Sequence, residues 1–389
     1  MRIGILTLPL RSNYGGILQC YALQTVLEKM GHDVIVLDRR FPAPGLRLFM
    51  LRCGSMMKCI VRKLLLHQDN VAIVLPWDEY YVIDKTLRTD TSELKDFIRK
   101  NIHLSRALRS TKELARQVRR QHLDCIIVGS DQVWRECYSP CITDYFLGFL
   151  QDGDKMLSIA YAASFGTADR PIGNASLDVC SGLAGRFRRV SVREMSGISL
   201  FREISGRNAE LVLDPTLLLE PRDYMFNDLC SAAPMSGKLV SYILDKSIDK
   251  DRIADDVSLA LRLPEKRMTL APRREDGTAG KMIPVPEWVF SISSASFVVT
   301  DSFHGCVFSI LWQRPFVAIV NSARGADRFV SLLSQLGLAG RMVRSHDEFT
   351  QRREELLVDV DFSRAARRLK ELKASSLGFL KEALEHPGF

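Results

Sequence analysis

The feature of this sequence that most restricts its fold is a series of short, mostly apolar runs that end on small or polar residues. The first run, Ile3 to Leu6, is followed by a polar turn and then by apolar residues at helical spacing. A second apolar run, Val34 to Leu37, comes directly after that stretch. A buried strand, a helix and another buried strand form a βαβ unit, which predicts an α/β fold with a parallel sheet.

Similar apolar runs continue along both halves of the chain. They cover residues 125–128, 158–163, 190–192 and 211–213, and then 239–244, 268–270, 297–300 and 316–320. In open parallel sheets, ligands bind where the strands end. Because the series restarts after Asp214-Pro215, we predict two Rossmann-like domains that face a cleft, residues 1–215 and residues 216–389. A basic amphipathic helix from about Ser363 to Leu384 is expected to pack back across that cleft.

The composition excludes some classes of protein but does not identify one function. The 389 residues are 46% hydrophobic and 26% charged, an ordinary globular balance that excludes a disordered chain. The net charge of +8 permits an anionic substrate or an acidic membrane surface, and it does not require nucleic acid. The nine cysteines include no CxxC pair, so we expect reduced thiols, no metal site and a cytoplasmic protein. No run approaches the roughly 18 apolar residues of a transmembrane helix.

Residues 41–75 mix basic residues with leucine, methionine, phenylalanine and isoleucine. The basic residues are Arg47, Arg52, Lys58, Arg62 and Lys63. The segment is either a helical flap whose basic side chains lie along its own apolar surface, or a peripheral contact with a membrane. The interruption at Cys53-Gly54-Ser55 favours the flap.

His304 is the best candidate for a catalytic residue. It lies between a buried strand and the start of a helix, a position that exposes a side chain at the sheet edge, and imidazole titrates near neutral pH. A structural histidine bonded to Asp301 or to a backbone carbonyl fits the spacing equally well. Arg193 ends another strand, where a guanidinium can bind phosphate or carboxylate. An ion pair with Glu194 or Asp214 is the alternative for Arg193.

The first helix begins at Asn13-Tyr14-Gly15-Gly16, where backbone N–H groups can bind an anion or a hydroxyl-rich ligand. The pattern lacks the G-x-G-x-x-G arrangement, and no P-loop occurs, so a dinucleotide or nucleotide site of these types is a weak interpretation. Asp131 can accept hydrogen bonds from sugar hydroxyls at the end of its strand. Alternatively, Ser130 or Asp131 only caps the next helix.

Six short motifs, taken together and in order, resemble the polysaccharide pyruvyl transferase family. They are NYGGILQCYALQ at 13–24, VGSDQVW at 128–134, YAASFG at 161–166, SVREMSG at 191–197, LDPT at 213–216 and TDSFHG at 300–305. Each motif alone is modest, but the ordered set is specific and extends over residues 1 to about 340.

The resemblance implies a pair of Rossmann domains like those of B-type glycosyltransferases. It also implies transfer of the enolpyruvyl unit of phosphoenolpyruvate to two hydroxyls of a sugar, which forms a pyruvate ketal and releases phosphate. The sugar would belong to a capsular or exopolysaccharide repeat unit carried on a lipid pyrophosphate, so we expect a protein that works at the inner face of the cell membrane. Phosphoenolpyruvate is then the donor substrate, and no further cofactor is expected.

The same resemblance assigns roles to the motif residues. His304 would be the acid–base catalyst, with Arg193 and the helix N-terminus after Gly305 stabilising the phosphate. Donor and phosphate binding is expected for Arg193, Ser302, His304, Gly305 and Arg328. Acceptor binding is expected for Asn13, Tyr14, Gly15, Gly16, Gln19, Ser130, Asp131 and Gln132.

One motif departs from the family pattern, because Ser302-Phe303-His304 stands where several members carry Arg-Leu-His. The chain therefore lacks one expected phosphate ligand unless Arg314, Arg324 or Arg328 replaces it, and we favour Arg328. Two other functions remain open: a glycosyltransferase that uses a nucleotide sugar, and a non-catalytic glycan-binding relative. The loop after Leu270 has no obvious aromatic or acidic ribose clamp, which counts against the nucleotide sugar.

Overall fold

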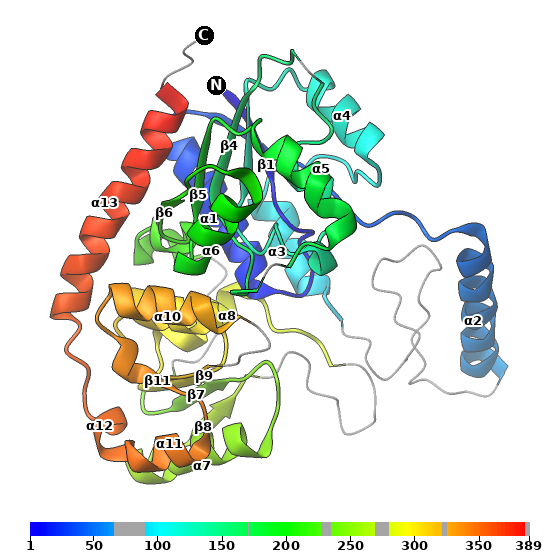
Figure 1. Cartoon of the computed structure of the whole chain (residues 1–389). Helices are drawn as coiled ribbons and strands as arrows, with labels where there is room; N and C mark the ends of the chain where they lie inside the picture. The colour runs from blue at the N-terminus through cyan, green and yellow to red at the C-terminus, as the bar shows by residue number, and fades with distance from the viewer. Residues whose placement is uncertain are drawn as a thin grey trace.

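Two parallel sheets, one from each half of the chain, organise the computed structural model (Figure 1). The structure describes residues 1–65, 90–151, 153–169, 171–226, 235–268, 280–320 and 325–385. Helices cover both sheets, as expected when parallel strands are joined by helical crossovers (Figure 1). The predicted α/β fold of two Rossmann-like domains is confirmed.

The first sheet has the strand order β2-β1-β3-β4-β5-β6, and all neighbouring strands are parallel. Its strands are β1 (Arg2–Leu6), β2 (Asp33–Val36), β3 (Cys125–Gly129), β4 (Leu157–Ala163), β5 (Arg189–Val192) and β6 (Glu210–Leu211). Its helices are α1 (Tyr14–Lys29), α3 (Ser92–Asn101), α4 (Thr111–Arg120), α5 (Asn174–Ala184) and α6 (Met195–Ser205). Both β3 and β4 are buried along their whole length, which explains their continuous apolar sequences.

The second sheet has the strand order β11-β10-β9-β7-β8 and is also parallel throughout. Its strands are β7 (Leu239–Tyr242), β8 (Glu265–Arg267), β9 (Phe297–Thr300), β10 (Phe316–Ile319) and β11 (Met342–Val343). Its helices are α7 (Ile248–Leu261), α8 (Val285–Ser293), α9 (Phe303–Leu311), α10 (Ala326–Gln335), α11 (His346–Gln351) and α12 (Arg353–Leu357). The central strands β7, β9 and β10 are completely buried.

The strand predicted at residues 268–270 is wrong in position, because the structure forms β8 directly before it. Residues 269 and 270 lie outside the described part of the chain. Strand β8 is an edge strand that pairs with β7 and consists of Glu265, Lys266 and Arg267, two of them exposed. A charged edge strand carries no apolar run, so the sequence pattern did not indicate it.

The structure also differs from the prediction in the basic segment, residues 41–75. Helix α2 (Leu46–Leu65) continues through Cys53-Gly54-Ser55 without a break, although we expected an interruption there. A single glycine costs a helix only about 1 kcal/mol relative to alanine, which the rest of a 20-residue helix offsets. In Figure 1, α2 stands away from both sheets. Residues 66–75 of the predicted flap lie outside the described residues.

Helix α13 (Ser363–Glu385) runs from the second sheet back to the first, as the sequence predicts (Figure 1). The Leu213 backbone N–H donates to Ser376 Oγ at 2.9 Å, and the Phe379 ring lies 6.1 Å from that of Tyr161. One apolar core also extends across both halves, where Tyr14 stacks on Trp288 with ring centroids 5.3 Å apart. The division into residues 1–215 and 216–389 falls between the two sheets and stays a prediction.

Candidate active site

A pocket of about 530 Å³ lies between the two halves of the chain, next to the ends of β3 and β9. The first half contributes Leu8, Pro9, Arg11, Ser12, Asn13, Gly16, Phe41, Asp131, Gln132, Cys137 and Tyr138. The second half contributes Tyr242, Leu244, Asp301, Ser302, Phe303, His304, Arg328 and Phe329. A larger hollow of about 1060 Å³ is lined by residues such as Met1, Asp124 and Leu157, at the amino ends of strands. None of the motif residues lines it, so the smaller pocket is the candidate site.

The His304 side chain lies in the first turn of α9 and is almost completely buried. The helix begins there because Ser302 Oγ accepts a hydrogen bond from the Gly305 backbone N–H at 3.3 Å. In the first half of the chain, a Cβ atom on Gly15 would lie 1.9 Å from His304 Nδ1, so only glycine leaves room for the imidazole. The two helix N-termini, one from each half of the chain, thus meet at this ring.

The His304 Nε2 atom lies 3.7 Å from Asp214 Oδ2, and within the described residues it has no hydrogen-bond partner. Asp301, the partner suggested by the spacing, is occupied elsewhere. Its carboxylate accepts hydrogen bonds from the Leu244 backbone N–H at 2.6 Å and from Lys250 Nζ at 2.7 Å. His304 is therefore not a structural histidine bonded to Asp301.

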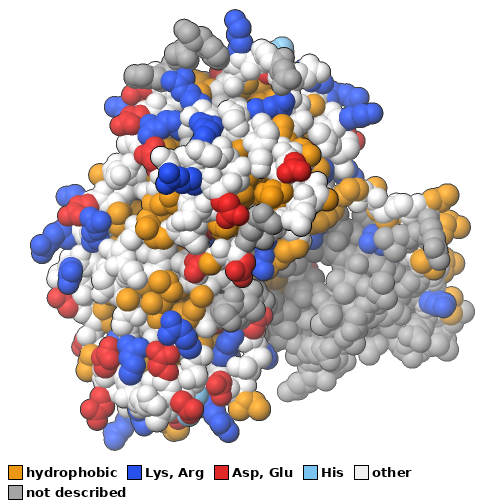
Figure 2. Space-filling model, in the orientation of Figure 1, with side chains coloured by type: hydrophobic (Ala, Val, Ile, Leu, Met, Phe, Trp, Pro, Cys, Tyr) orange, Lys and Arg blue, Asp and Glu red, His pale blue; other side chains and the backbone are white. Residues whose placement is uncertain are grey.

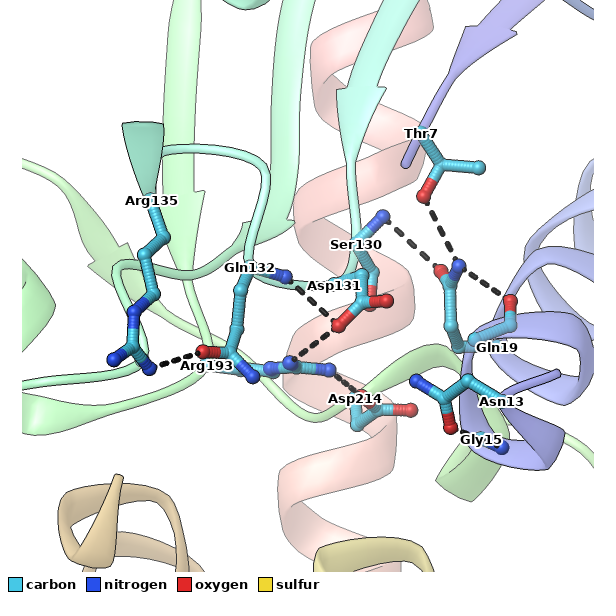
Figure 3. A network of polar contacts seen from close by, with 12 residues as sticks. Thr7, Asn13, Gly15, Gln19, Ser130, Asp131, Gln132, Arg135, Arg193 and Asp214 are labelled. Atoms are coloured by element: carbon cyan, nitrogen blue, oxygen red, sulfur yellow. Dashed lines mark hydrogen bonds and ion pairs between the residues drawn. The ribbon is translucent and has the colours of Figure 1, made fainter. Parts of the chain in front are cut away.

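Arg193 lies beneath the pocket and joins two carboxylates (Figure 3). Its Nη1 donates to Asp214 Oδ2 at 2.6 Å, and its Nη2 donates to Asp131 Oδ1 at 3.3 Å. Burial alone would lower the pKa of Arg193, but Asp214, Asp131 and Glu194 raise it above its ordinary value. The predicted ion pair with Asp214 is thus present, whereas direct binding of phosphate by Arg193 stays a prediction.

Asp214 connects Arg193 to His304 and is itself fully buried. It also accepts hydrogen bonds from the backbone N–H of Thr216 at 3.0 Å and from Thr216 Oγ1 at 2.6 Å. Burial alone would raise the pKa of Asp214, but contacts with His304, Arg193 and Thr216 hold it well below its ordinary value. The carboxylate is therefore ionised at neutral pH and faces the imidazole as an anion.

Asp131 is the carboxylate of the first half that reaches the pocket. Its Oδ1 accepts a hydrogen bond from the Gln132 backbone N–H at 2.8 Å (Figure 3). A Cβ atom on Gly16 would lie 3.3 Å from its Oδ2. The preceding Gly129 has a φ of +136°, and a Cβ atom there would lie 2.0 Å from the carbonyl oxygen of Tyr161. Only glycine permits this turn at the end of β3, which orients Asp131 toward the second half of the chain.

Arg328 supplies a second buried guanidinium, this one lining the pocket. Its Cζ and that of Arg193 each lie 5.4 Å from the centroid of the Phe303 ring. Burial and the nearby positive charge of Arg193 lower the pKa of Arg328 to about 10, so it remains a cation at neutral pH. Of the three arginines considered as a replacement, Arg328 is thus in the pocket. Arg314 does not line it, and Arg324 lies outside the described residues.

The structure brings the predicted site residues together in two layers. Those that line the pocket are Asn13, Gly16, Asp131, Gln132, Ser302, His304 and Arg328. Those behind the lining are Tyr14, Gly15, Gln19, Ser130, Arg193 and Gly305. Gln19, for example, donates to Thr7 Oγ1 at 3.0 Å and accepts from the Ser130 backbone N–H at 3.2 Å, and so holds two loops in place (Figure 3).

Sequence reasoning missed several pocket residues. Arg11, Phe41 and Tyr138 line the first-half side, and the Arg11 guanidinium lies 4.5 Å from the centroid of the Phe41 ring. All three lie in loops or short turns without a periodic pattern. The available signal was weak: aromatic residues close to the ends of predicted strands.

Within the described ranges, no group of three or more histidine, cysteine, aspartate or glutamate side chains is arranged to hold a metal ion. The same part of the chain contains no helix long and apolar enough to cross a membrane. The loop after Leu270, considered for a ribose clamp, lies outside the described residues.

The fold and the interdomain pocket define the class of the protein, a two-domain α/β protein of the type found in B-type glycosyltransferases and related epimerases. The putative UDP-N-acetylglucosamine 2-epimerase from Listeria monocytogenes has a TM-score of 0.52 at 9% identity, with 99% of this chain and 96% of that chain covered. A mutant of the O-GlcNAc transferase from Thermobaculum terrenum has a TM-score of 0.50 at 14% identity, with 99% of this chain covered. This chain spans 66% of that one. At such low identity these likenesses show the fold alone.

Residues 13–323 match the model of the family described as polysaccharide pyruvyl transferase. The chain therefore belongs to that family, as its six motifs predict. Comparison with curated proteins gives no significant match.

Proposed function

We propose that this protein transfers the pyruvyl unit of phosphoenolpyruvate to two hydroxyls of a sugar, which forms a pyruvate ketal and releases phosphate. The observation that carries the proposal is the position of His304 and Arg328 in one pocket with Asp131 opposite, in a chain of the pyruvyl transferase family. The pocket has a size suited to a small anionic donor and part of a sugar.

The second half of the chain would hold the donor. Arg328 offers a buried cation, and the N-terminus of α9 adds the partial positive charge of a helix end. Arg193 and Arg328 each lie 5.4 Å from the centroid of the Phe303 ring, so a phosphate or carboxylate bound at Arg328 would also lie near a second buried cation. This supports Arg328 as the replacement for the arginine that the Ser302-Phe303-His304 motif lacks.

The reaction needs proton transfers and loss of phosphate. Protonation of the donor methylene by His304 would make the neighbouring carbon electrophilic, and a sugar hydroxyl would then add to that carbon. The carbon–oxygen bond to phosphate breaks, and the second hydroxyl replaces the leaving phosphate. Of the two hydroxyl protons, one balances the proton placed on the methyl group and the other leaves with phosphate. Ionised Asp214, 3.7 Å from Nε2, would stabilise the imidazolium form that protonates the methylene and that is restored when His304 takes up a hydroxyl proton.

The first half of the chain would hold the acceptor. Asp131 and Gln132 offer hydrogen-bond acceptors and donors for sugar hydroxyls, and Asn13 lies beside them at the start of α1. Phe41 and Tyr138 add aromatic surface, which suits the apolar face of a sugar ring. We expect a repeat unit of a capsular or exopolysaccharide carried on a lipid pyrophosphate, so that the enzyme works at the cytoplasmic face of a membrane.

The direct experiment supplies phosphoenolpyruvate and a panel of sugars with adjacent or 4,6-hydroxyl pairs to the purified protein and measures phosphate release and ketal formation. Formation of both products in equal amounts supports the proposal. Release of a nucleoside diphosphate from a nucleotide sugar instead would identify a glycosyltransferase. Tight glycan binding without any turnover would identify a non-catalytic relative.

A further inference from the structure

Helix α2 is the one long helix of the described residues that Figure 1 draws apart from both sheets. It follows Phe41, a residue that lines the pocket, after only a short connection. Five residues of extended chain reach at most about 18 Å, so the start of α2 stays close to the mouth of the pocket. The helix is therefore an arm attached beside the proposed site.

The arm carries an unusual amount of exposed apolar surface. Six of the fifteen large hydrophobic residues that are exposed among the described residues lie in this one helix. Five of them, Leu46, Met50, Met57, Val61 and Leu64, follow the three- and four-residue spacing of a single helix face. From Leu46 to Leu64 this row extends for about 27 Å at 1.5 Å per residue. Leu46 is 79% exposed and Leu64 is 66% exposed, so the row is open at both ends.

The charge of the arm is of one sign. Residues Leu46–Leu65 include five lysines or arginines and no aspartate or glutamate. Of the basic residues, Lys58 is exposed and Arg52 is half-buried. Figure 2 shows hydrophobic and basic side chains together at the end of the molecule where α2 lies in Figure 1. A partner of this helix must therefore present apolar material and negative charge along a straight line.

We propose that α2 docks the protein on an anionic lipid bilayer, with the row Leu46–Met50–Met57–Val61–Leu64 inserted among the acyl chains. Leucine and methionine side chains suit a fluid apolar phase, and basic residues bind the phosphate groups of anionic lipids. A bilayer presents acyl chains and lipid phosphates as a continuous surface, so it can contact the whole straight row of about 27 Å. Binding itself does not depend on the proposed function, but it would hold the pocket mouth close to a lipid-linked acceptor.

The test mixes the purified full chain, without donor or acceptor, with vesicles of phosphatidylcholine alone or with phosphatidylglycerol added. We expect sedimentation with the anionic vesicles and loss of binding when the salt concentration is raised. The triple variant M50E/M57E/L64E should bind these vesicles at least about tenfold more weakly, because it places three carboxylates in the inserted row. The double variant R52Q/K58Q should bind more weakly and depend less on salt.

The matched control is I248E/L259E, which places carboxylates at two equally exposed apolar positions on α7 and should bind like the wild type. Equal melting temperatures establish that each variant is folded. A wild-type protein that does not sediment with anionic vesicles overturns the proposal, and so does a triple variant that binds as well as the wild type. Self-association that the triple variant abolishes, without vesicle binding, would assign the row to a second copy of the chain. Because no step uses phosphoenolpyruvate, these results are independent of whether the protein is a pyruvyl transferase.

Discussion

The two sides of the pocket differ in how their charges are balanced. On the side of the first half, Arg193 is held between Asp131 and Asp214, with contacts of 3.3 Å and 2.6 Å. On the side of the second half, burial and the charge of Arg193 lower the pKa of Arg328 to about 10, while Glu194, Asp131 and Asp214 act in the opposite direction. The difference indicates that the first half supplies a fixed, internally neutralised support. We propose that the second half, through Arg328, supplies positive charge to an anionic donor.

The largest effect is expected where the two sides meet. Replacing His304 with alanine removes the only histidine that lines the pocket among the described residues, and should lower turnover by about 10²–10⁴-fold. The measurement is phosphate release at saturating donor. The matched control is H346A, which removes a histidine paired with Asp256 at 2.8 Å outside the pocket and should keep normal turnover. Near-normal turnover in H304A with wild-type folding would remove His304 from the mechanism.

A smaller effect on turnover is expected when the His304 imidazole is displaced but not removed. The substitution Gly15→Ala places a methyl group 1.9 Å from the present position of His304 Nδ1, so the imidazole must move. Displacement of a catalytic group by about 1 Å can cost about 10²-fold in rate. Gly182→Ala is the control, because no heavy atom lies within 4 Å of a Cβ atom there. If both variants have wild-type kcat, the position of the imidazole is not critical.

Replacing the cation of the second half should affect donor binding more than turnover. In R328Q a charge-assisted contact with the donor is lost, and we expect KM for phosphoenolpyruvate to rise about 10- to 100-fold. R314Q is the control, because Arg314 follows α9, the helix of His304, without lining the pocket. Equal KM values for the two variants would mean that Arg328 does not bind the donor.

The smallest effect on activity is expected on the side of the first half, where carboxylates neutralise Arg193. The effect on stability should be clear there. Asp214→Asn leaves Arg193 and the ring of His304 without their shared anion, which should destabilise the fold by about 3 kcal/mol. D144N, which breaks the equally buried pair with Arg39 at 2.7 Å, should cost similar stability without changing kcat. Urea unfolding and steady-state kinetics of both variants separate the two effects. If D144N loses both stability and kcat as D214N does, Asp214 has no special role in catalysis.

The same carboxylate predicts a pH dependence. Its pKa in the folded protein is held below the ordinary value of about 3.9 that it regains on unfolding. The stability that ionised Asp214 contributes is therefore complete above about pH 4, and it is lost as the pH falls toward the folded pKa. Below about pH 4 the unfolding free energy of D214N should fall less steeply than that of the wild type. Equal slopes would contradict the assignment of a depressed pKa to Asp214.

Much of the fold followed from the sequence because buried parallel strands and helices carry distinct apolar periods. His304 and Asp131 were recognisable for the same reason, since each lies within a few residues of the end of a buried strand. Acceptor binding by Tyr14 and Gln19 stays a prediction; the two residues do not line the pocket and lie against Trp288 and Ser130. Helical spacing identifies a buried face but does not tell which buried residues face a partner domain.

Other parts of the site could not be predicted for physical reasons. Phe41 lies in a loop and lines the pocket. A loop has no regular repeat, so the sequence does not predict the direction of its side chains. Asp214 appeared only within the LDPT motif and as a possible partner of Arg193, because its contact with His304 joins residues from different halves of the chain. Edge strand β8 was missed because its exposed charged residues form no apolar run.

The proposed function depends on binding of phosphoenolpyruvate in the pocket that contains His304 and Arg328. Thermal unfolding of the wild type with phosphoenolpyruvate, UDP or a UDP-sugar tests it most directly. At a ligand concentration of 100 times Kd, phosphoenolpyruvate should stabilise the fold by about 2.7 kcal/mol, and UDP and the UDP-sugar should have no effect. R328Q should lose most of that stabilisation at the same concentration. Stabilisation by UDP or the UDP-sugar, with no response to phosphoenolpyruvate, would contradict the account.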